Sequence, residues 1–137
     1  MAQWEADMRR IKALTEAKMV KVLRIASMET TRDIIMDTPV DTGRLRGNWQ
    51  CGVGQKTEGQ LSVFDKSGGV TIARITSVLS QLNKNDVAVF YNNLPYAYPI
   101  EFGHSTRKAP QGMVRKNLTN WGSRVARIAR VVKNERA

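Results

Sequence analysis

The first residues in this 137-residue chain that could do chemistry are Asp41-Thr42-Gly43. The same tripeptide occurs in aspartic proteases, where two carboxylates share one proton, so a chain with one copy would have to act as a homodimer. Here Arg44-Leu45-Arg46 follows at once. Two guanidinium groups beside the carboxylate favour its ionised form and oppose proton sharing. We therefore interpret the tripeptide as a turn after Pro39, and a protease is the weaker alternative.

The other reactive side chains give weaker signals. His104 is the single histidine, and with Glu101 it offers two metal ligands without companions. Cys51 is the single cysteine and lies in an alternating segment, which favours a small buried apolar side chain over a nucleophile. Gly52-Val53-Gly54 lacks the third glycine of a phosphate-binding loop. We expect no catalytic residue, no metal and no cofactor, and hence no enzyme.

Length and composition are those of one ordinary globular domain, residues 1–137. The segment Met1–Met8 contains two acidic residues and no apolar run, so we expect no signal peptide. No stretch approaches the roughly 18 apolar residues of a membrane span. With a single cysteine, synthesis in a reducing cytoplasm is expected.

Charge is distributed unevenly along the chain. The net charge is +10, and residues 104–137 hold nine basic groups and one acidic group, so most of the excess lies there. Such a distribution indicates a basic element that faces an anionic partner rather than a uniformly basic protein.

Hydrophobic spacing predicts an α+β fold. The expected elements are a long helix over 3–37, strands over 49–53, 61–64 and 87–91, and helices over 70–82 and 110–134. The first helix is long enough that we expect a break, a projecting end or packing against a neighbouring copy. The β-branched content of Val70–Thr76 also permits a strand, but the spacing of Ile72, Ile75 and Leu79 favours a helix. The apolar strand 87–91 is expected to be covered on both faces.

The last predicted helix is amphipathic. Its apolar stripe is Val114, Leu118, Trp121, Val125, Ile128 and Val132, and Pro110 lies where the helix should begin. The cations opposite or beside this stripe are Arg115, Lys116, Arg124, Arg127, Arg130 and Lys133. A solvated face and contact with nucleic acid or an acidic protein ring are equally supported. Base-specific reading is disfavoured, because the helix has no helix-turn-helix partner.

Two motifs in order make the chain recognisable. Pro39-Val40-Asp41-Thr42-Gly43-Arg44-Leu45-Arg46 ends the first helix, and Asn92 to Gly103 contains Tyr96-Ala97, Glu101 and Gly103 at the spacing N-x-x-x-Y-A-x-x-x-E-x-G. In this order they resemble the tail-completion, or neck, proteins of long-tailed bacteriophages, the lambda-type minor tail family. The resemblance spans about Ile11 to Leu118, and His104–Met113 departs from the family pattern.

This resemblance implies a non-catalytic virion protein that completes the head-proximal end of the tail and joins it to the head as a ring, expected to be hexameric. Arg44 and Arg46 are fork-shaped donors suited to a carboxylate of an adjacent subunit, with Asp41 and Glu101 as acceptors. Tyr96, Tyr98 and Phe102 are side chains of the kind enriched at interfaces, although a lid over the sheet is almost as well supported. Neighbouring tail and neck proteins are the expected partners. A basic nucleic-acid-binding module is the main alternative function.

Overall fold

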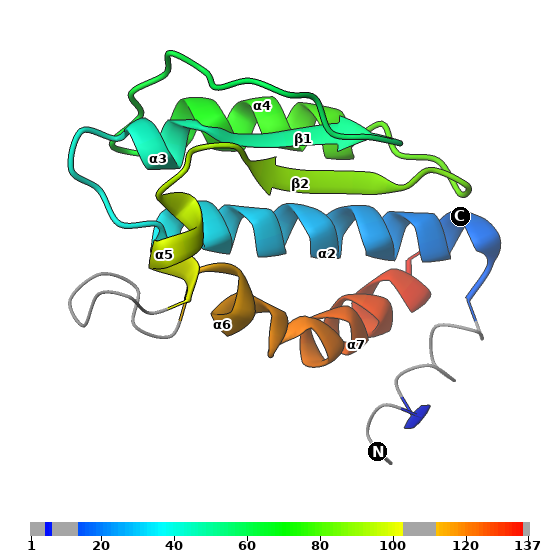
Figure 1. Ribbon diagram of the computed structural model, residues 1–137. Helices are drawn as coiled ribbons and strands as arrows, with labels where there is room; N and C mark the ends of the chain where they lie inside the picture. Colours follow the sequence, from blue (N-terminus) through cyan, green and yellow to red (C-terminus); the bar gives the residue numbers. More distant parts are fainter. Residues whose placement is uncertain (1–4, 7–13, 103–111, 136–137) are drawn as a thin grey trace.

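The computed structural model describes residues 5–6, 14–102 and 112–135, and it confirms the predicted α+β class (Figure 1). In chain order its elements are α2 (Glu16–Asp37), α3 (Arg44–Gly47), β1 (Trp49–Val53), α4 (Gly69–Leu79), β2 (Ala88–Asn92), α5 (Ala97–Glu101), α6 (Val114–Leu118) and α7 (Trp121–Lys133). Within the described ranges, no helix combines the length and apolar character needed to cross a bilayer.

Helix α2 is the central element of the fold. The sheet and α4 pack on one side of it, and α6 and α7 run along the other (Figure 1). Its residues Ile34 and Ile35 belong to a hydrophobic cluster with the sheet and α4, and Val22 and Ala26 belong to a second cluster with α7. One helix therefore contributes to two cores.

The predicted helix over 3–37 is not continuous. Leu14 and Thr15 are not helical, and α2 begins at Glu16. Thr15 has extended backbone angles, and its hydroxyl accepts a hydrogen bond from the Lys18 N–H at 3.3 Å, which is the geometry of an N-cap. Except for Glu5 and Ala6, the part of the predicted helix before Leu14 lies outside the described residues.

The sheet has two antiparallel strands, paired from Trp49 with Asn92 to Val53 with Ala88. Trp49 stacks on Phe90 with their ring centroids 4.6 Å apart, which fixes the inner face of the sheet on the first cluster. The prediction of a strand covered on both faces is wrong, because every residue of β2 is only partly buried. Ala88 and Phe90 of β2 pack against the first cluster, and a sheet of only two strands is too narrow to shield these side chains completely from solvent.

The predicted strand over 61–64 does not form. The side-chain amide of Asn48, itself fully buried, accepts from the Leu61 N–H at 2.7 Å and donates to the Leu61 carbonyl at 3.0 Å. One side chain thus satisfies both backbone groups that a strand neighbour would have used. The segment is held close to β1 without joining the sheet.

Helix α4 is present where a helix was predicted over a competing strand, and it buries Thr71, Ile75 and Leu79 at four-residue spacing. Asp65 anchors its first turn by accepting from the N–H groups of Gly68 and Thr71 and from the Thr71 hydroxyl. Burial raises the pKa of the Asp65 carboxyl, but these hydrogen bonds outweigh burial and leave the pKa below its ordinary value.

The single C-terminal helix predicted over 110–134 is two helices, α6 and α7, separated at Thr119 and Asn120. The Thr119 hydroxyl donates to the Lys116 carbonyl, a side-chain bond that competes with continued helix. Val125, Ile128 and Val132 are buried as the stripe predicted, but Leu118 is 52% exposed because the chain turns just after it. Pro110 lies outside the described residues.

Candidate assembly interface

The two sequence motifs, about fifty residues apart in the chain, meet at one end of the molecule. The turn after α2 and helix α5 together line a shallow cavity of about 130 Å³. Its walls come from both motifs: Pro39, Asp41, Thr42, Gly43, Arg44, Leu45, Tyr96 and Ile100. Six of the seven predicted interface residues lie in or next to these two segments, and Arg46 follows in α3.

Gly43 makes the turn between α2 and α3 possible. Its φ of 87° lies in the left-handed region, and a Cβ there would come within 2.8 Å of the backbone of Asp65. Its carbonyl accepts from the N–H groups of Gly47 and Asp65. Asp41-Thr42-Gly43 is therefore a turn packed on the loop before α4, as interpreted from the sequence.

Arg46 holds this turn in place within its own chain. Its guanidinium donates to the carbonyls of Met36 at 3.0 Å, Thr38 at 2.8 Å and Lys66 at 2.6 Å. These bonds join the end of α2 to the loop before α4. They occupy two of the three guanidinium nitrogens. Contact of Arg46 with another subunit stays a prediction, and such a contact would need the part of the side chain that these bonds leave accessible.

Arg44 and Asp41 are less committed. Arg44 donates to the Gln60 side chain at 2.7 Å, and Asp41 is exposed. Among the described residues no hydrogen bond or ion pair involves the Asp41 carboxylate. The turn thus presents one guanidinium and one carboxylate at the rim of the cavity.

Helix α5 presents aromatic side chains to solvent. Tyr96, Tyr98 and Phe102 are 40%, 66% and 48% exposed. The ring centroids of Tyr98 and Phe102 lie 4.5 Å apart. We call these three residues the aromatic cluster. Their exposure is inconsistent with an intramolecular lid over the sheet. Asn92 fixes the approach to α5, since it donates to the Leu45 carbonyl and accepts from the Leu94 N–H.

Glu101 anchors α6 instead of facing outward. Its carboxylate accepts from the N–H groups of Met113, Val114 and Arg115 at 2.7 to 3.0 Å and pairs with the Arg115 side chain. Its side chain is 13% exposed. Burial raises the pKa of the Glu101 carboxyl, but the bonds from Val114, Arg115 and Met113 outweigh it and leave the pKa lowered. Gly112 permits this approach, because a Cβ there would lie 2.5 Å from a Glu101 oxygen.

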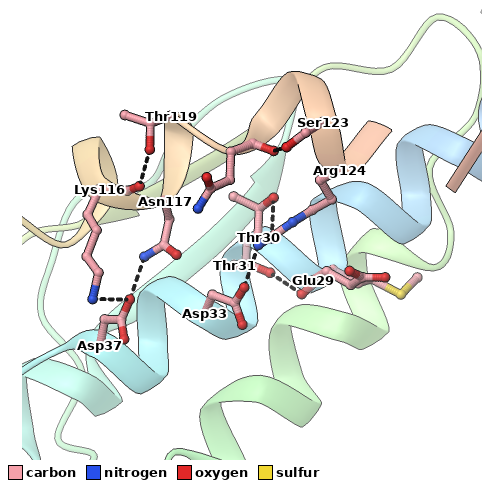
Figure 2. Close-up of polar contacts among 12 residues, drawn as sticks. Glu29, Thr30, Thr31, Asp33, Asp37, Lys116, Asn117, Thr119, Ser123 and Arg124 are labelled. Atoms are coloured by element: carbon pink, nitrogen blue, oxygen red, sulfur yellow. Dashed lines mark hydrogen bonds and ion pairs between the residues drawn. The ribbon is translucent and has the colours of Figure 1, made fainter. Parts of the chain in front are cut away.

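The basic C-terminal segment is paired with an acidic stripe on α2. Figure 2 shows Asp37 next to Lys116 and Asn117, and Asp33 facing Arg124, which also donates to Thr30 at 2.8 Å. One turn further along α2, Glu29 pairs with Arg127. With the Arg115–Glu101 pair, four of the six predicted anion-contacting cations have a carboxylate partner in their own chain. Contact with an anionic partner stays a prediction.

Two of those six cations are differently placed. Arg130 and Lys133 are exposed on the last turns of α7 and form no ion pair with another described residue. Arg130 also lines an open concavity of about 380 Å³ together with Glu29, Asn120, Ser123, Arg124 and Arg127. This face of α7 is the least neutralised part of the predicted basic surface.

The sequence interpretation missed the carboxylates that place α6 and α7. Glu29, Asp33 and Asp37 occur at four-residue spacing, so they form one line along a helix, and that spacing is visible in the sequence. It matches a basic helix that needs acidic partners. Asn48 and Asp65 were also missed, and for them the sequence gives no comparable periodic signal.

The described residues offer little support for a metal site or a nucleophile. They contain no cluster of three or more His, Cys, Asp or Glu side chains that could hold a metal. Cys51 is half-buried, and burial raises the pKa of its thiol, which lowers the thiolate fraction needed for nucleophilic attack. His104 lies outside the described residues.

Comparison with known proteins shows a family match. The family model described as "Bacteriophage HK97-gp10, putative tail-component" matches residues 2–103, which include both motifs. No curated protein and no solved structure matches the chain. The matched region ends before α6, so the helices that carry the paired basic face follow it.

The role of Glu101 as an anchor can be tested by substitution. Glu101→Ala removes the acceptor of three backbone N–H groups and should lower the free energy of unfolding by about 2–3 kcal/mol. Glu101→Gln keeps one acceptor oxygen and should cost less. Since the folded pKa is lowered, the carboxylate stabilises the fold above its unfolded pKa of about 4.3, and this contribution is lost as pH falls through the folded pKa.

Urea unfolding followed by circular dichroism at neutral and acidic pH measures both effects. The difference between wild type and Glu101→Gln should shrink on acidification. Glu58→Gln, at an exposed position, is the matched control and should change little at either pH. Equal effects at the two positions would contradict the anchoring role.

Proposed function

The chain belongs to the HK97-gp10-like family of phage tail components, and we propose that it completes the head-proximal end of the tail and joins it to the head as a homo-oligomeric ring. The family membership itself makes it a structural tail protein of the virion. The ring, its six-fold order and its place at the neck are supported by the resemblance of the two motifs to tail-completion proteins. We also propose that residues 1–137 form one domain, because α2 is shared by both hydrophobic clusters.

One observation supports an assembly role most directly: the motif residues fall into two groups. Gly43, Arg46 and Glu101 are used within the chain, where they shape the turn, tie it to its neighbours and anchor α6. In contrast Asp41 and the aromatic cluster are exposed at the same end of the molecule. Exposed aromatic side chains with a carboxylate and a guanidinium beside them have the composition of a protein interface.

The position of the chain in the virion tests the proposal. In images of assembled particles we expect its density as a ring between the tail tube and the head. When phage assembly proceeds without a functional copy of this chain, heads and tails should accumulate separately. Density at the distal tip of the tail, or joined particles in the absence of this chain, would contradict the neck assignment.

Arg44 is a direct test of the ring. Among the described residues its guanidinium donates one hydrogen bond, to Gln60, so Arg44→Ala should change the free energy of unfolding by less than about 1 kcal/mol. If Arg44 pairs with a carboxylate of the adjacent subunit, the same change should weaken assembly. Light scattering coupled to size exclusion measures the mass, and Arg32→Ala, at an exposed position on α2, is the control. An unchanged oligomer would exclude this pairing.

We propose further that the outer face of α7 contacts the phosphate backbone of DNA without sequence specificity. After the pairs with α2 are counted, Arg130 and Lys133 remain the exposed cations of that face, with Asn120 and Ser123 as additional hydrogen-bonding groups. Arginine and small polar side chains are common phosphate contacts. A face of this size fits few phosphates, so the predicted binding is weak and sensitive to salt.

A salt titration tests this contact. Binding to a random duplex followed by fluorescence should weaken as salt rises, with a slope of about 0.9 per phosphate in a plot of log affinity against log salt. Arg130→Ala should reduce that slope by about 1. Lys56→Ala, on the loop after β1, should leave it unchanged. No binding, or an equal slope for Arg130→Ala, would remove DNA from the partners.

A further inference from the structure

An apolar groove runs along α2 between the sheet and the C-terminal helices α6 and α7. Its main part has a volume of about 330 Å³, and its walls include Ile34, Cys51, Leu79, Phe90, Leu118 and Trp121. A second concavity of about 210 Å³ shares Ser27, Ala88 and Trp121 with it and continues toward Leu23, Arg24 and Lys84. We call the two together the α2 groove. Its main part is within the size range of pockets that accept apolar guests.

Apolar side chains at both ends of the groove are exposed to solvent. Leu118 continues the apolar stripe of the C-terminal segment, yet it is 52% exposed because the chain turns between α6 and α7. Leu23 on α2 is 46% exposed at the other end. Solvent contact with these side chains is unfavourable, so a partner that covers them gains the corresponding hydrophobic free energy.

The aromatic cluster on α5 is a suitable partner in chemistry and in rigidity. The rings of Tyr98 and Phe102 pack on each other, and the Arg115 guanidinium lies 4.9 Å from the centroid of the Phe102 ring. Arg115 is itself fixed by its pair with Glu101. A cluster held in this way loses little conformational entropy when it binds, which favours its use as an interface anchor.

We propose that the aromatic cluster of one copy inserts into the α2 groove of a second copy. The inference rests on the proposed ring, because a ring protein must contact itself, and this chain presents both halves of the contact. Cluster and groove are different surfaces of the molecule, so the contact is heterologous, the kind that closes into a ring when the rotation between copies permits.

Charge complementarity supports the same pairing. Asp41, exposed beside Tyr96 in the cavity at the α2–α3 turn, has no cationic partner among the described residues. The far end of the α2 groove contains Arg24, whose Nε donates to the Leu82 carbonyl, and Lys84, paired with Glu16 on the surface. Asp86 also lies there and stays negatively charged while its carboxylate accepts from the Asn83 N–H, so the residues that line this end have a net charge of +1. Because Lys84 is already paired with Glu16, Arg24 is the cation that the Asp41 carboxylate beside the cluster would meet.

The buried area is consistent with an anchor rather than a whole interface. From their exposed fractions, the three aromatic residues can bury roughly 230–390 Å², since a fully covered aromatic side chain buries about 150–250 Å². A stable interface covers about 800 Å² per partner. The remainder must come from the surfaces around the cluster and the groove, as in interfaces where a few central residues are surrounded by weaker contacts.

The single cysteine makes the contact testable by cross-linking. Cys51 lines the groove, and Tyr98 is exposed at the tip of the cluster. Full-length Tyr98→Cys protein treated with a short bismaleimide should give a covalent dimer on a denaturing gel, with Cys51 of one copy joined to position 98 of another. Mass spectrometry of the linked peptides identifies the pair. Ser77→Cys, exposed on α4, and Tyr98→Cys combined with Cys51→Ser should give no such dimer.

Two further variants measure the strength of the contact. Tyr98→Glu on the cluster and Leu118→Glu on the groove rim are both at exposed positions, so circular dichroism should show an unchanged fold. Each should raise the dissociation constant of the oligomer roughly tenfold or more. Ser77→Glu is the control and should leave it unchanged.

The outcomes separate this contact from the proposed ring. A linked pair in a species of two copies alone supports the contact and refutes the ring. A ring with the mass of the wild-type oligomer but without a link between Cys51 and position 98 overturns the contact and is still consistent with the proposed ring. A chain that stays monomeric and unlinked at high concentration also overturns the contact.

Discussion

The hydrogen bonds of Arg46 are the constraint on which the rest of the structure depends. They bring the last carbonyls of α2 and the loop before α4 to one guanidinium, and hydrogen bonds of a charged donor contribute about 1.5–3 kcal/mol each. Its Nε is buried without a partner among the described residues, so the arrangement is not free of cost. With the turn fixed, Gly43 packs on Asp65, Asp65 anchors α4, and Trp49 reaches the Thr38 hydroxyl.

Charge has a different meaning in the folded chain than in the sequence. A net charge of +8 over the last 34 residues predicts a free basic face, but α2 carries a line of carboxylates that pairs with much of it. Arg124 shows how complete this can be, because it is 11% exposed and bonded to Asp33 and Thr30. The excess cations act first as a means of docking α7 on α2. On α7, as far as the structure describes the chain, Arg130 and Lys133 are the exposed cations without a carboxylate partner, and they remain for an external anion.

Periodic features of the fold could be predicted from sequence, and features made by single polar side chains could not. The spacing of Ile72, Ile75 and Leu79 gave α4 correctly, because burial on one helix face leaves a pattern. The absent strand over 61–64 depends on the amide of Asn48, which replaces a neighbouring strand and leaves no pattern. In the interface, residue type alone could not separate Glu101, which is used internally, from Asp41, which is exposed.

The segment beyond the family match bears on what the matched region can bind. The matched region, residues 2–103, contains all three residues of the aromatic cluster. Arg115, which lies over the Phe102 ring and pairs with Glu101, belongs to α6 and follows that region. Val114, Leu118 and Trp121, also beyond the match, form one wall of the α2 groove. If α6 and α7 were absent, the cluster would lose a rigid contact and the groove would become an open face of α2. The contact proposed between the cluster and the groove therefore depends on residues of α6 and α7 as well as on residues of the family region.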